Sequence, residues 1–399
     1  MHETYKEKMT EKIVDHFSQM ELRIMEDIIR RIRKTGGITS TAGHQINRLM
    51  MLGNSTEDIE KFIKEALDAS YPEMFEMYDA VLENEYVRNR ALYEQVNVRF
   101  IPYEENLQLQ QAVEALRTQT AGDFQNITQS MGFMVDIGGG RRAFTPMSVY
   151  YQQYLDAAMT DIVSGAFDYG SVLRRTVTQM TNSGIRTVFY APKNSSRIYT
   201  NRIDVAVRRA VMTGASKLAG EISQYNARQL DTEYFEVSWH ENARPTHRVW
   251  HGRVWSRREL ESVCGLGSVT GLCGANCYHD YYPFVPGASE RSYPDSWLKE
   301  QDRKEDTPKY FRGKGYTAYE ATQKQRQMET AMRVQREKVH LLKHGGASDE
   351  EVMLARCRYQ GQLDEYAVFS KKMGLVQQRE RIYLDMRGRV APRRERRRS

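Results

Sequence analysis

Seven histidine and cysteine side chains fall between positions 240 and 279, and these residue types bind transition metals or take part in nucleophilic catalysis. They occur in two segments, WHENARPTHRVWHG at 239–252 and CGANCYHDYYPF at 273–284, and in the stretch between. The full set is His240, His247, His251, Cys264, Cys273, Cys277 and His279. A structural zinc site takes four such nitrogen or sulfur ligands, often from two short loops. The two segments therefore predict either a metal site or a small packed fold.

The ligand set follows from local geometry. Residues i and i+2 of an extended segment point the same way, so Cys277 and His279 can face one ion. His247 follows Arg-Pro-Thr, near a turn that can bring it to them, and Cys273 is the fourth candidate. These four residues are the candidate ligands of a structural zinc ion. The competing hypothesis, which the sequence favours, is that the same groups only pack and hydrogen-bond in an aromatic-rich module.

Catalysis is the third possibility for this cluster. The only nearby carboxylates are Glu241 and Asp280, and neither stands in a known catalytic pattern. The sequence lacks a GxSxG, a Walker-type phosphate loop, an HExxH and a GxGxxG that follows a strand. The glycines of IGGGRR at 137–142 lack the lysine of a phosphate loop, so a flexible loop is expected there. We predict no enzyme; the rival hypothesis is a metal-dependent nuclease or toxin-like effector that uses the His/Cys cluster.

The positive charge of the chain is concentrated at its C-terminus. The net charge is +6, and residues 387–399 alone hold seven arginines and one glutamate. Such a segment is predicted to be a disordered tail that binds phosphates without sequence preference, or one that only aids solubility. Its candidate nucleic-acid-binding residues are Arg393, Arg394, Arg396, Arg397 and Arg398.

Membrane and secretion signals are missing from the sequence. No apolar run approaches the roughly 20 residues of a membrane span, and the N-terminus has no apolar signal region. A reducing compartment is therefore expected, where four cysteines serve as metal ligands or buried thiols more readily than as disulfides.

The periodicity of apolar residues predicts a mainly α fold with a small α+β module. An elongated helical body is expected over 1–230. Its predicted helices are 3–34, 42–51, one from Ser55 to about 67, one from Ser70 and Pro72 to about 97, 104–132, 147–165, 169–184 and 197–230. Strands at EYFEVSW and GRVWS predict a compact Cys/His-containing module over 231–290. A polar linker (291–317), a C-terminal helical hairpin (318–386) and the basic tail (387–399) complete the expected domains.

The two Cys/His segments together resemble phage minor capsid proteins, most closely the type 2 branch, and more broadly the Mu F-like head morphogenesis domain. The segments ITSTAGHQINRL at 38–49, RIDVAVRRAVMTG at 202–214 and TAYEATQKQRQMETAMR at 317–333 resemble the same proteins. His279 stands where other members carry a second cysteine. The matching motif positions are Arg244, Pro245, Thr246, His247, Gly252, Asn276, Cys277, His279 and Pro283.

The resemblance implies a low-copy, non-enzymatic head component that is associated with the portal and acts in head assembly or genome packaging. Its implied partners are the portal protein, the major capsid or scaffold protein, and packaged double-stranded DNA bound nonspecifically by the tail. It implies a place in the virion, in the head interior or at the portal, and in the bacterial host cytoplasm during assembly. An assembly chaperone or scaffold that leaves the mature particle is the second alternative.

Overall fold

The computed structural model describes residues 2–35, 55–189, 199–384 and 387–392. The chain forms two compact units, each drawn from three separated stretches. The first unit comprises Met1–Ile13, Ser70–Phe124 and Arg208–Lys324, and the second comprises Val14–Ala69, Gln125–Val207 and Gln325–Ser399. Helices hold most of the described residues and the sheets are small. This confirms the predicted mainly α fold with a small α+β part.

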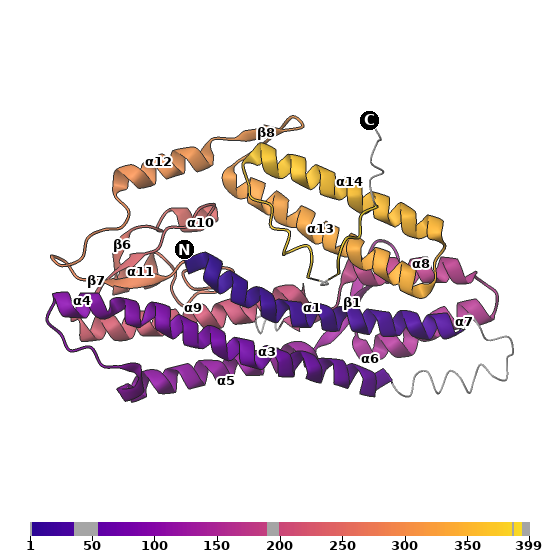
Figure 1. Ribbon diagram of the computed structural model, residues 1–399, viewed down its shortest axis with the longest axis horizontal. Helices are drawn as coiled ribbons and strands as arrows, with labels where there is room; N and C mark the ends of the chain where they lie inside the picture. The colour runs from indigo at the N-terminus through magenta and orange to yellow at the C-terminus, as the bar shows by residue number, and fades with distance from the viewer. Residues whose placement is uncertain (1, 36–54, 190–198, 385–386, 393–399) are drawn as a thin grey trace. The chain divides into compact units, whose positions relative to one another are not determined.

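Five long helices contribute residues to both units (Figure 1). They are α1 (His2–Thr35), α3 (Ser55–Glu85), α5 (Leu107–Gln129), α9 (Ile203–Gln229) and α13 (Ala318–Gly345). Each carries apolar residues three and four positions apart, which places them on one face. On α1, for example, Ile13, Phe17, Ile24 and Ile28 are fully buried. The helices predicted at 3–34 and from 318 are confirmed, whereas the one predicted at 42–51 lies outside the described residues.

Helix α3 corrects one predicted boundary. The sequence suggested that a helix starts at Ser70 and Pro72, but α3 passes through Pro72 without interruption and ends at Glu85. A proline inside a helix costs about 3 kcal/mol, because it removes a hydrogen bond and crowds the preceding turn. Ala66 before it and Met74 after it are both buried. Burial on both sides of the proline offsets that cost. The chain then continues in short helices, η1 (Val87–Asn89), α4 (Arg90–Gln95) and η2 (Tyr103–Glu105).

A three-stranded antiparallel sheet organises the Cys/His module of the first unit. Its strand order is β6-β5-β7, formed by β6 (Val254–Ser256), β5 (Tyr234–Val237) and β7 (Tyr281–Phe284). The strands predicted in EYFEVSW and GRVWS are confirmed, and β7 was not predicted. Two short helices, α10 (Pro245–Arg248) and α11 (Arg257–Ser262), lie in the connections. The core beneath them consists of Ala227, Phe235, Val237, Trp250, Leu260, Cys264, Leu272, Cys277 and Tyr281.

The segment predicted as a polar linker contains regular structure. Helix α12 (Asp295–Asp306) is followed by a hairpin of β8 (Lys309–Phe311) and β9 (Lys314–Tyr316). Arg248 donates hydrogen bonds to Asp302 at 3.0 Å and to Asp306 at 2.5 Å, and Leu298 is buried. These contacts join α12 to α10 within the first unit. The composition of this segment is polar on average, so it gave no sign of the buried Leu298 or of the contacts that Arg248 makes with Asp302 and Asp306.

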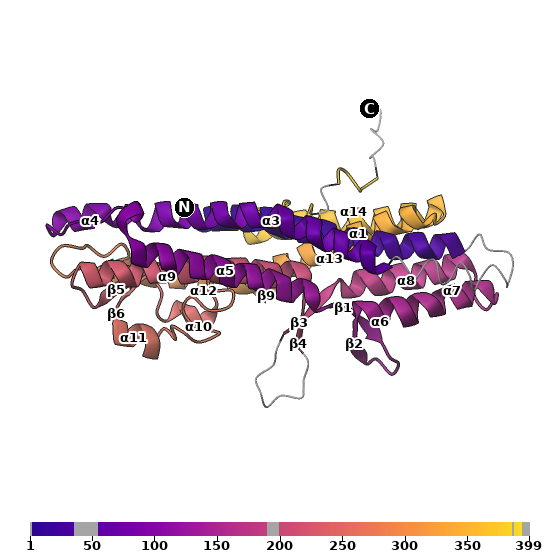
Figure 2. The same ribbon diagram turned by 90° about the horizontal axis from the view of Figure 1, so that it is seen from below.

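The second unit contains a four-stranded antiparallel sheet that the sequence did not predict. Its order is β2-β1-β3-β4, formed by β2 (Arg142–Pro146), β1 (Met131–Asp136), β3 (Arg186–Phe189) and β4 (Tyr199–Arg202). The predicted flexible loop at 137–142 is the turn of the β1–β2 hairpin, and its last residue opens β2. Helix α6 (Met147–Val149) packs beside β1 (Figure 2), and η3 (Tyr150–Leu155), α7 (Asp156–Val163) and α8 (Tyr169–Ser183) follow.

Helix α13 and helix α14 (Asp349–Met373) form the predicted hairpin (Figure 1). Ser348 and Glu351 form a capping box at the start of α14, and Gly374 ends it in the left-handed conformation. Residues 374–384 and 387–392 lie against the hairpin: Ile382 and Ala391 share a buried cluster with Met332, Tyr359 and Tyr366, and Arg336 donates to the carbonyl oxygens of Arg387 and Gly388. Arg393 and the arginines after it lie outside the described residues.

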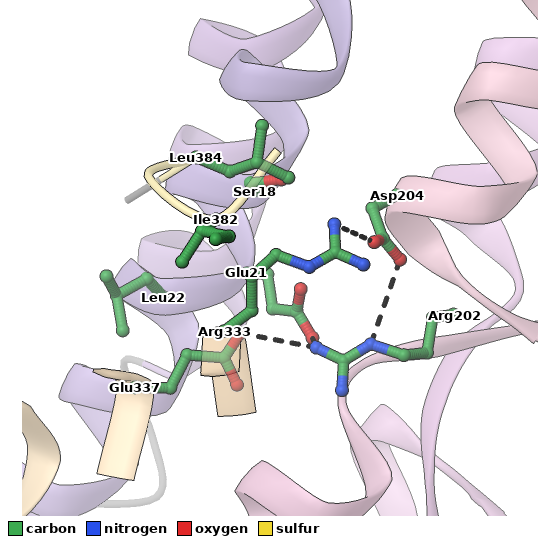
Figure 3. Close-up of a pocket in the computed structure, with 9 residues that line it drawn as sticks. All are labelled: Ser18, Glu21, Leu22, Arg202, Asp204, Arg333, Glu337, Ile382 and Leu384. Atoms are coloured by element: carbon green, nitrogen blue, oxygen red, sulfur yellow. Dashed lines mark hydrogen bonds and ion pairs between the residues drawn. The ribbon is translucent and has the colours of Figure 1, made fainter. Parts of the chain in front are cut away.

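A group of buried charges lies inside the second unit (Figure 3). Arg333 Nη1 is 2.7 Å from Asp204 Oδ2, and Arg202 Nη2 is 3.2 Å from Glu337 Oε1. Glu21 joins them as a third carboxylate, beside a cavity of about 20 Å³. Burial raises the pKa of Glu337 to about 8, against the opposing effect of Arg202. The cluster therefore favours the protonated form of Glu337 at neutral pH.

Candidate metal centre

The Arg-Pro-Thr-His segment builds a single helical turn. Arg244 is extended, as expected before a proline, and Pro245 is the first residue of α10. The His247 amide donates to the Arg244 carbonyl at 2.8 Å, and the His251 amide donates to the His247 carbonyl at 3.1 Å. This turn directs both histidines into the module, where each is 2% exposed.

The second segment is a tight loop that Arg244 holds in place. The Nη2 atom of Arg244 donates to the carbonyl oxygens of Ala275 at 2.9 Å and Asn276 at 2.8 Å. A Cβ on Gly274 would lie 2.6 Å from the carbonyl oxygens of Ser268 and Val269, so only glycine fits. The arginine of the first motif thus fixes the backbone that carries Cys277 in the second.

Three of the four predicted ligands converge. One ligand atom each from His247, Cys277 and His279 lies within 4.8 Å of the other two, and all three residues are buried. The Nδ1 atoms of His247 and His279 are 3.4 Å apart, and Cys277 Sγ is 3.5 Å from His279 Nδ1. For zinc–nitrogen bonds of about 2.0–2.1 Å and a zinc–sulfur bond of about 2.3 Å, tetrahedral angles require separations of roughly 3.3 and 3.6 Å. Both measured separations match those of a tetrahedral zinc site.

The hydrogen bonds around the two histidines expose the lone pairs that a metal needs. His247 Nε2 lies 2.9 Å from the carbonyl oxygen of Thr270, which can only accept, so the proton belongs on Nε2 and Nδ1 carries a lone pair. His279 Nε2 lies 3.3 Å from His251 Nδ1, which also faces the amide N–H of His240 at 3.5 Å. If His251 Nδ1 accepts from both, His279 is protonated on Nε2 and its Nδ1 also carries a lone pair.

Two lone pairs that face each other at 3.4 Å repel, and a cation between them removes the repulsion. With a metal bound, Thr270 and His251 would serve as the outer partners that orient metal-binding histidines in proteins. The arrangement therefore fits a metal ion, and in the absence of an ion the Cys277 thiol lies 3.5 Å from His279 Nδ1, where it can donate to that lone pair.

Burial also favours the neutral forms of the histidines in this cluster. It lowers the pKa of His247 and of His279, so both imidazoles are neutral, which is the form that binds metal. It also lowers the pKa of His251 to about 3 and raises that of Cys277 to about 11. A zinc ion would supply the positive charge that a Cys277 thiolate requires in this apolar surrounding.

The remaining candidates take other positions. Cys273 is not part of the converging group; its Sγ lies 3.6 Å from the carbonyl oxygen of His279. Cys264 is a buried core residue, and burial raises its pKa to about 12. The ring of His240 packs edge-on against that of His279, with centroids 4.8 Å apart. Glu241 is exposed. A metal ion held by these three residues would take its fourth ligand from water or from a group that moves in.

Asp280, the other carboxylate considered from the sequence, is part of a buried ion pair. Lys6 Nζ lies 2.6 Å from Asp280 Oδ2, and both residues are 5% exposed. Glu85 is close enough to contribute electrostatically, and its pKa is raised to about 7 by burial and then by Asp280. The sequence contained no signal for Lys6, since 274 positions separate it from Asp280.

A sequence profile of the phage minor capsid protein 2 family matches residues 1–367. The chain belongs to this family. The resemblance to type 2 phage minor capsid proteins is thereby confirmed, and the family gives the protein a structural role in the virion, in contact with other head proteins. No curated protein and no solved structure matches the chain. Within the described residues, none of the helices combines the length and apolarity needed to cross a bilayer.

Proposed function

We propose that this minor capsid protein is a resident, non-enzymatic component of the phage head that sits at the portal and acts in head assembly and genome packaging. Family membership over residues 1–367 supports the head assignment. The portal, the major capsid or scaffold protein and packaged DNA are its proposed partners.

We further propose that His247, Cys277 and His279 hold one structural zinc ion, with Cys273 or water as the fourth ligand. The single observation that carries the zinc proposal is the convergence of three buried ligand atoms within 4.8 Å of one another, with two of their separations, 3.4 and 3.5 Å, at tetrahedral values.

The zinc ion would act as a clamp between two loops. His247 belongs to the α10 turn, whereas Cys277 and His279 precede β7. An ion shared by these segments closes the chain between them, and its binding energy becomes folding energy. Because the ligands are 2–3% exposed, the ion would be taken up as the module folds.

The burial of the centre favours this structural role over the rival hypothesis of a metal-dependent nuclease. A hydrolytic metal needs an open position that substrate can reach, with a nearby group that accepts a proton. Here the three ligands are buried and the neighbouring Asp280 is engaged by Lys6. A nuclease assay on purified protein, with and without chelator, tests this directly. Chelator-sensitive cleavage of DNA would overturn the non-enzymatic assignment.

The tail arginines are proposed to contact packaged DNA. Arg393, Arg394, Arg396, Arg397 and Arg398 would neutralise phosphates, so affinity should be independent of sequence and should fall steeply with salt. Deletion of residues 393–399 should lower duplex affinity and flatten its salt dependence. Unchanged binding would assign the segment to another role.

Quantitative mass spectrometry of empty proheads, DNA-filled particles and unassembled lysate tests the proposed place in the particle. A few copies per particle in both head forms are expected of a resident protein. Presence in proheads but not in filled heads would show an assembly factor that departs. Cross-linking in proheads would identify the neighbour, and the portal protein is the expected product.

A further inference from the structure

A second group of metal-binding side chains lies in the other unit, where helices α1 and α13 meet. It consists of Glu26 on α1 and of His340 and His344 on α13. One ligand atom from each residue lies within 4.8 Å of the other two, and all three residues are partly buried. This group shares no residue with the His247 centre and plays no part in the proposed function above.

The helical spacing of the two histidines favours joint binding. Residues four apart on an α-helix lie on the same face, one turn above the other. The ring centroids of His340 and His344 are 6.0 Å apart. His340 Nε2 hydrogen-bonds to Glu26 Oε1, so the third donor already lies against the pair. Two imidazole nitrogens and a carboxylate oxygen on one side of an ion form a donor set that suits Zn²⁺ and similar divalent ions.

The carboxylate of Glu26 already binds one positively charged side chain, that of Arg387. Arg387 Nη2 donates to the same Oε1 atom at 2.7 Å. The side chains of Glu26 and His340 are each 25% exposed, so an ion can enter from solvent while part of the site stays dry. A divalent cation would compete with the Arg387 guanidinium for this carboxylate, because both are drawn to one negative charge.

We propose that Glu26, His340 and His344 form an exchangeable divalent metal site, with Zn²⁺ as the ligand and water completing its coordination. The ion joins α1 to α13 and displaces the Arg387 side chain from Glu26. Arg387 belongs to the described residues 387–392, whose backbone is tied to α13 because Arg336 donates to the Arg387 carbonyl oxygen. Metal binding at this site is therefore coupled to how the C-terminal segment is held against α1.

Calorimetric titration of the full-length protein with ZnCl₂, after dialysis to remove loosely bound metal, tests the proposal. The wild type should take up one further Zn²⁺ per chain. His344→Ala should abolish this uptake, and Glu26→Gln should weaken it tenfold or more, since even outer partners of a metal site contribute 10–100-fold in affinity. Lys343→Ala removes an exposed neighbour on the same helix and should leave uptake unchanged.

Arg387→Gln separates the proposed site from a chance pair of surface histidines. Removal of the competing guanidinium should tighten Zn²⁺ binding severalfold, whereas a site that does not involve Glu26 would not respond. The proposal is overturned if His344→Ala binds as much Zn²⁺ as the wild type, or if Arg387→Gln leaves affinity unchanged or weaker. Neither result bears on the buried His247 centre, because none of these substitutions changes one of its proposed ligands.

Discussion

The buried ion pair between Lys6 and Asp280 gives a prediction that can be worked out in some detail. Both residues are 5% exposed, and the Nζ–Oδ2 distance is 2.6 Å. Replacement of Lys6 by methionine keeps the length of the side chain and removes its charge. Asp280 then remains buried close to the carboxyl group of Glu85, with no cation between them. Breaking one side of a buried pair costs about 3–5 kcal/mol.

The measurement is thermal unfolding followed by circular dichroism. A unit of roughly 150–250 residues shifts its melting temperature by about 2–4 °C per kcal/mol. Lys6→Met should therefore lower the transition of the first unit by about 10 °C. The matched control is Lys8→Met, which removes an exposed lysine from the same helix and should shift the transition by no more than about 2 °C.

The effect of Lys6→Met should depend on pH. Burial raises the pKa of Glu85 to about 7, so its favourable contribution is present at low pH and is lost as pH rises through that value. At pH 5, Glu85 carries a proton and one of the two negative charges that Lys6 offsets is gone. The destabilisation should therefore be smaller at pH 5 than at pH 8. Adding Asp280→Asn should restore much of the stability at pH 8; a double variant as unstable as the single one would refute the reasoning, as would an unchanged melting temperature for Lys6→Met.

Two further substitutions test the second unit, and a third, at a glycine of the first unit, is the control for one of them. The folded-state pKa of Glu337, about 8, exceeds its ordinary value, so the stability that it contributes is present at low pH and lost as pH rises toward 8. Glu337→Gln should abolish this decline, worth on the order of a few kcal/mol, in urea midpoints measured from pH 5 to 9; a decline equal to that of the wild type would contradict the assignment. A Cβ on Gly132 would lie 2.2 Å from the Thr145 carbonyl oxygen, so Gly132→Ala should cost about 1–3 kcal/mol in the same assay. Gly122→Ala, a helical position with open space around it, should instead be neutral or stabilising by up to about 1 kcal/mol.

The helical part of the fold was predictable because its signal repeats over many turns. The stripe on α1 and the hairpin of α13 and α14 each show apolar residues at helical spacing over 25 residues or more. The β2-β1-β3-β4 sheet was missed for the opposite reason. Its strands are four to six residues long, too short for an alternating pattern to stand out, and β1 follows α5 after a single residue.

The ligand group was predictable where it depended on local geometry. Cys277 and His279 are two residues apart, and their donor atoms do lie side by side. Cys273 was chosen because it is near in sequence, but its backbone has a positive φ of 57° and its Sγ lies near the His279 carbonyl oxygen instead. The backbone oxygen of Thr270 and the distant Lys6 carry no residue pattern that could have identified them. Contacts of this kind depend on the tertiary fold.

The metal content of the purified protein tests the central structural claim most directly. Elemental analysis by inductively coupled plasma mass spectrometry, after dialysis against a mild chelator, should find one zinc per chain in the wild type. Cys277→Ser should lose this zinc and melt at a lower temperature. Cys357→Ser, which removes an exposed cysteine of the other unit, should keep the zinc. A wild-type protein that is fully folded and free of metal would contradict the account and would leave His247, Cys277 and His279 as packing residues.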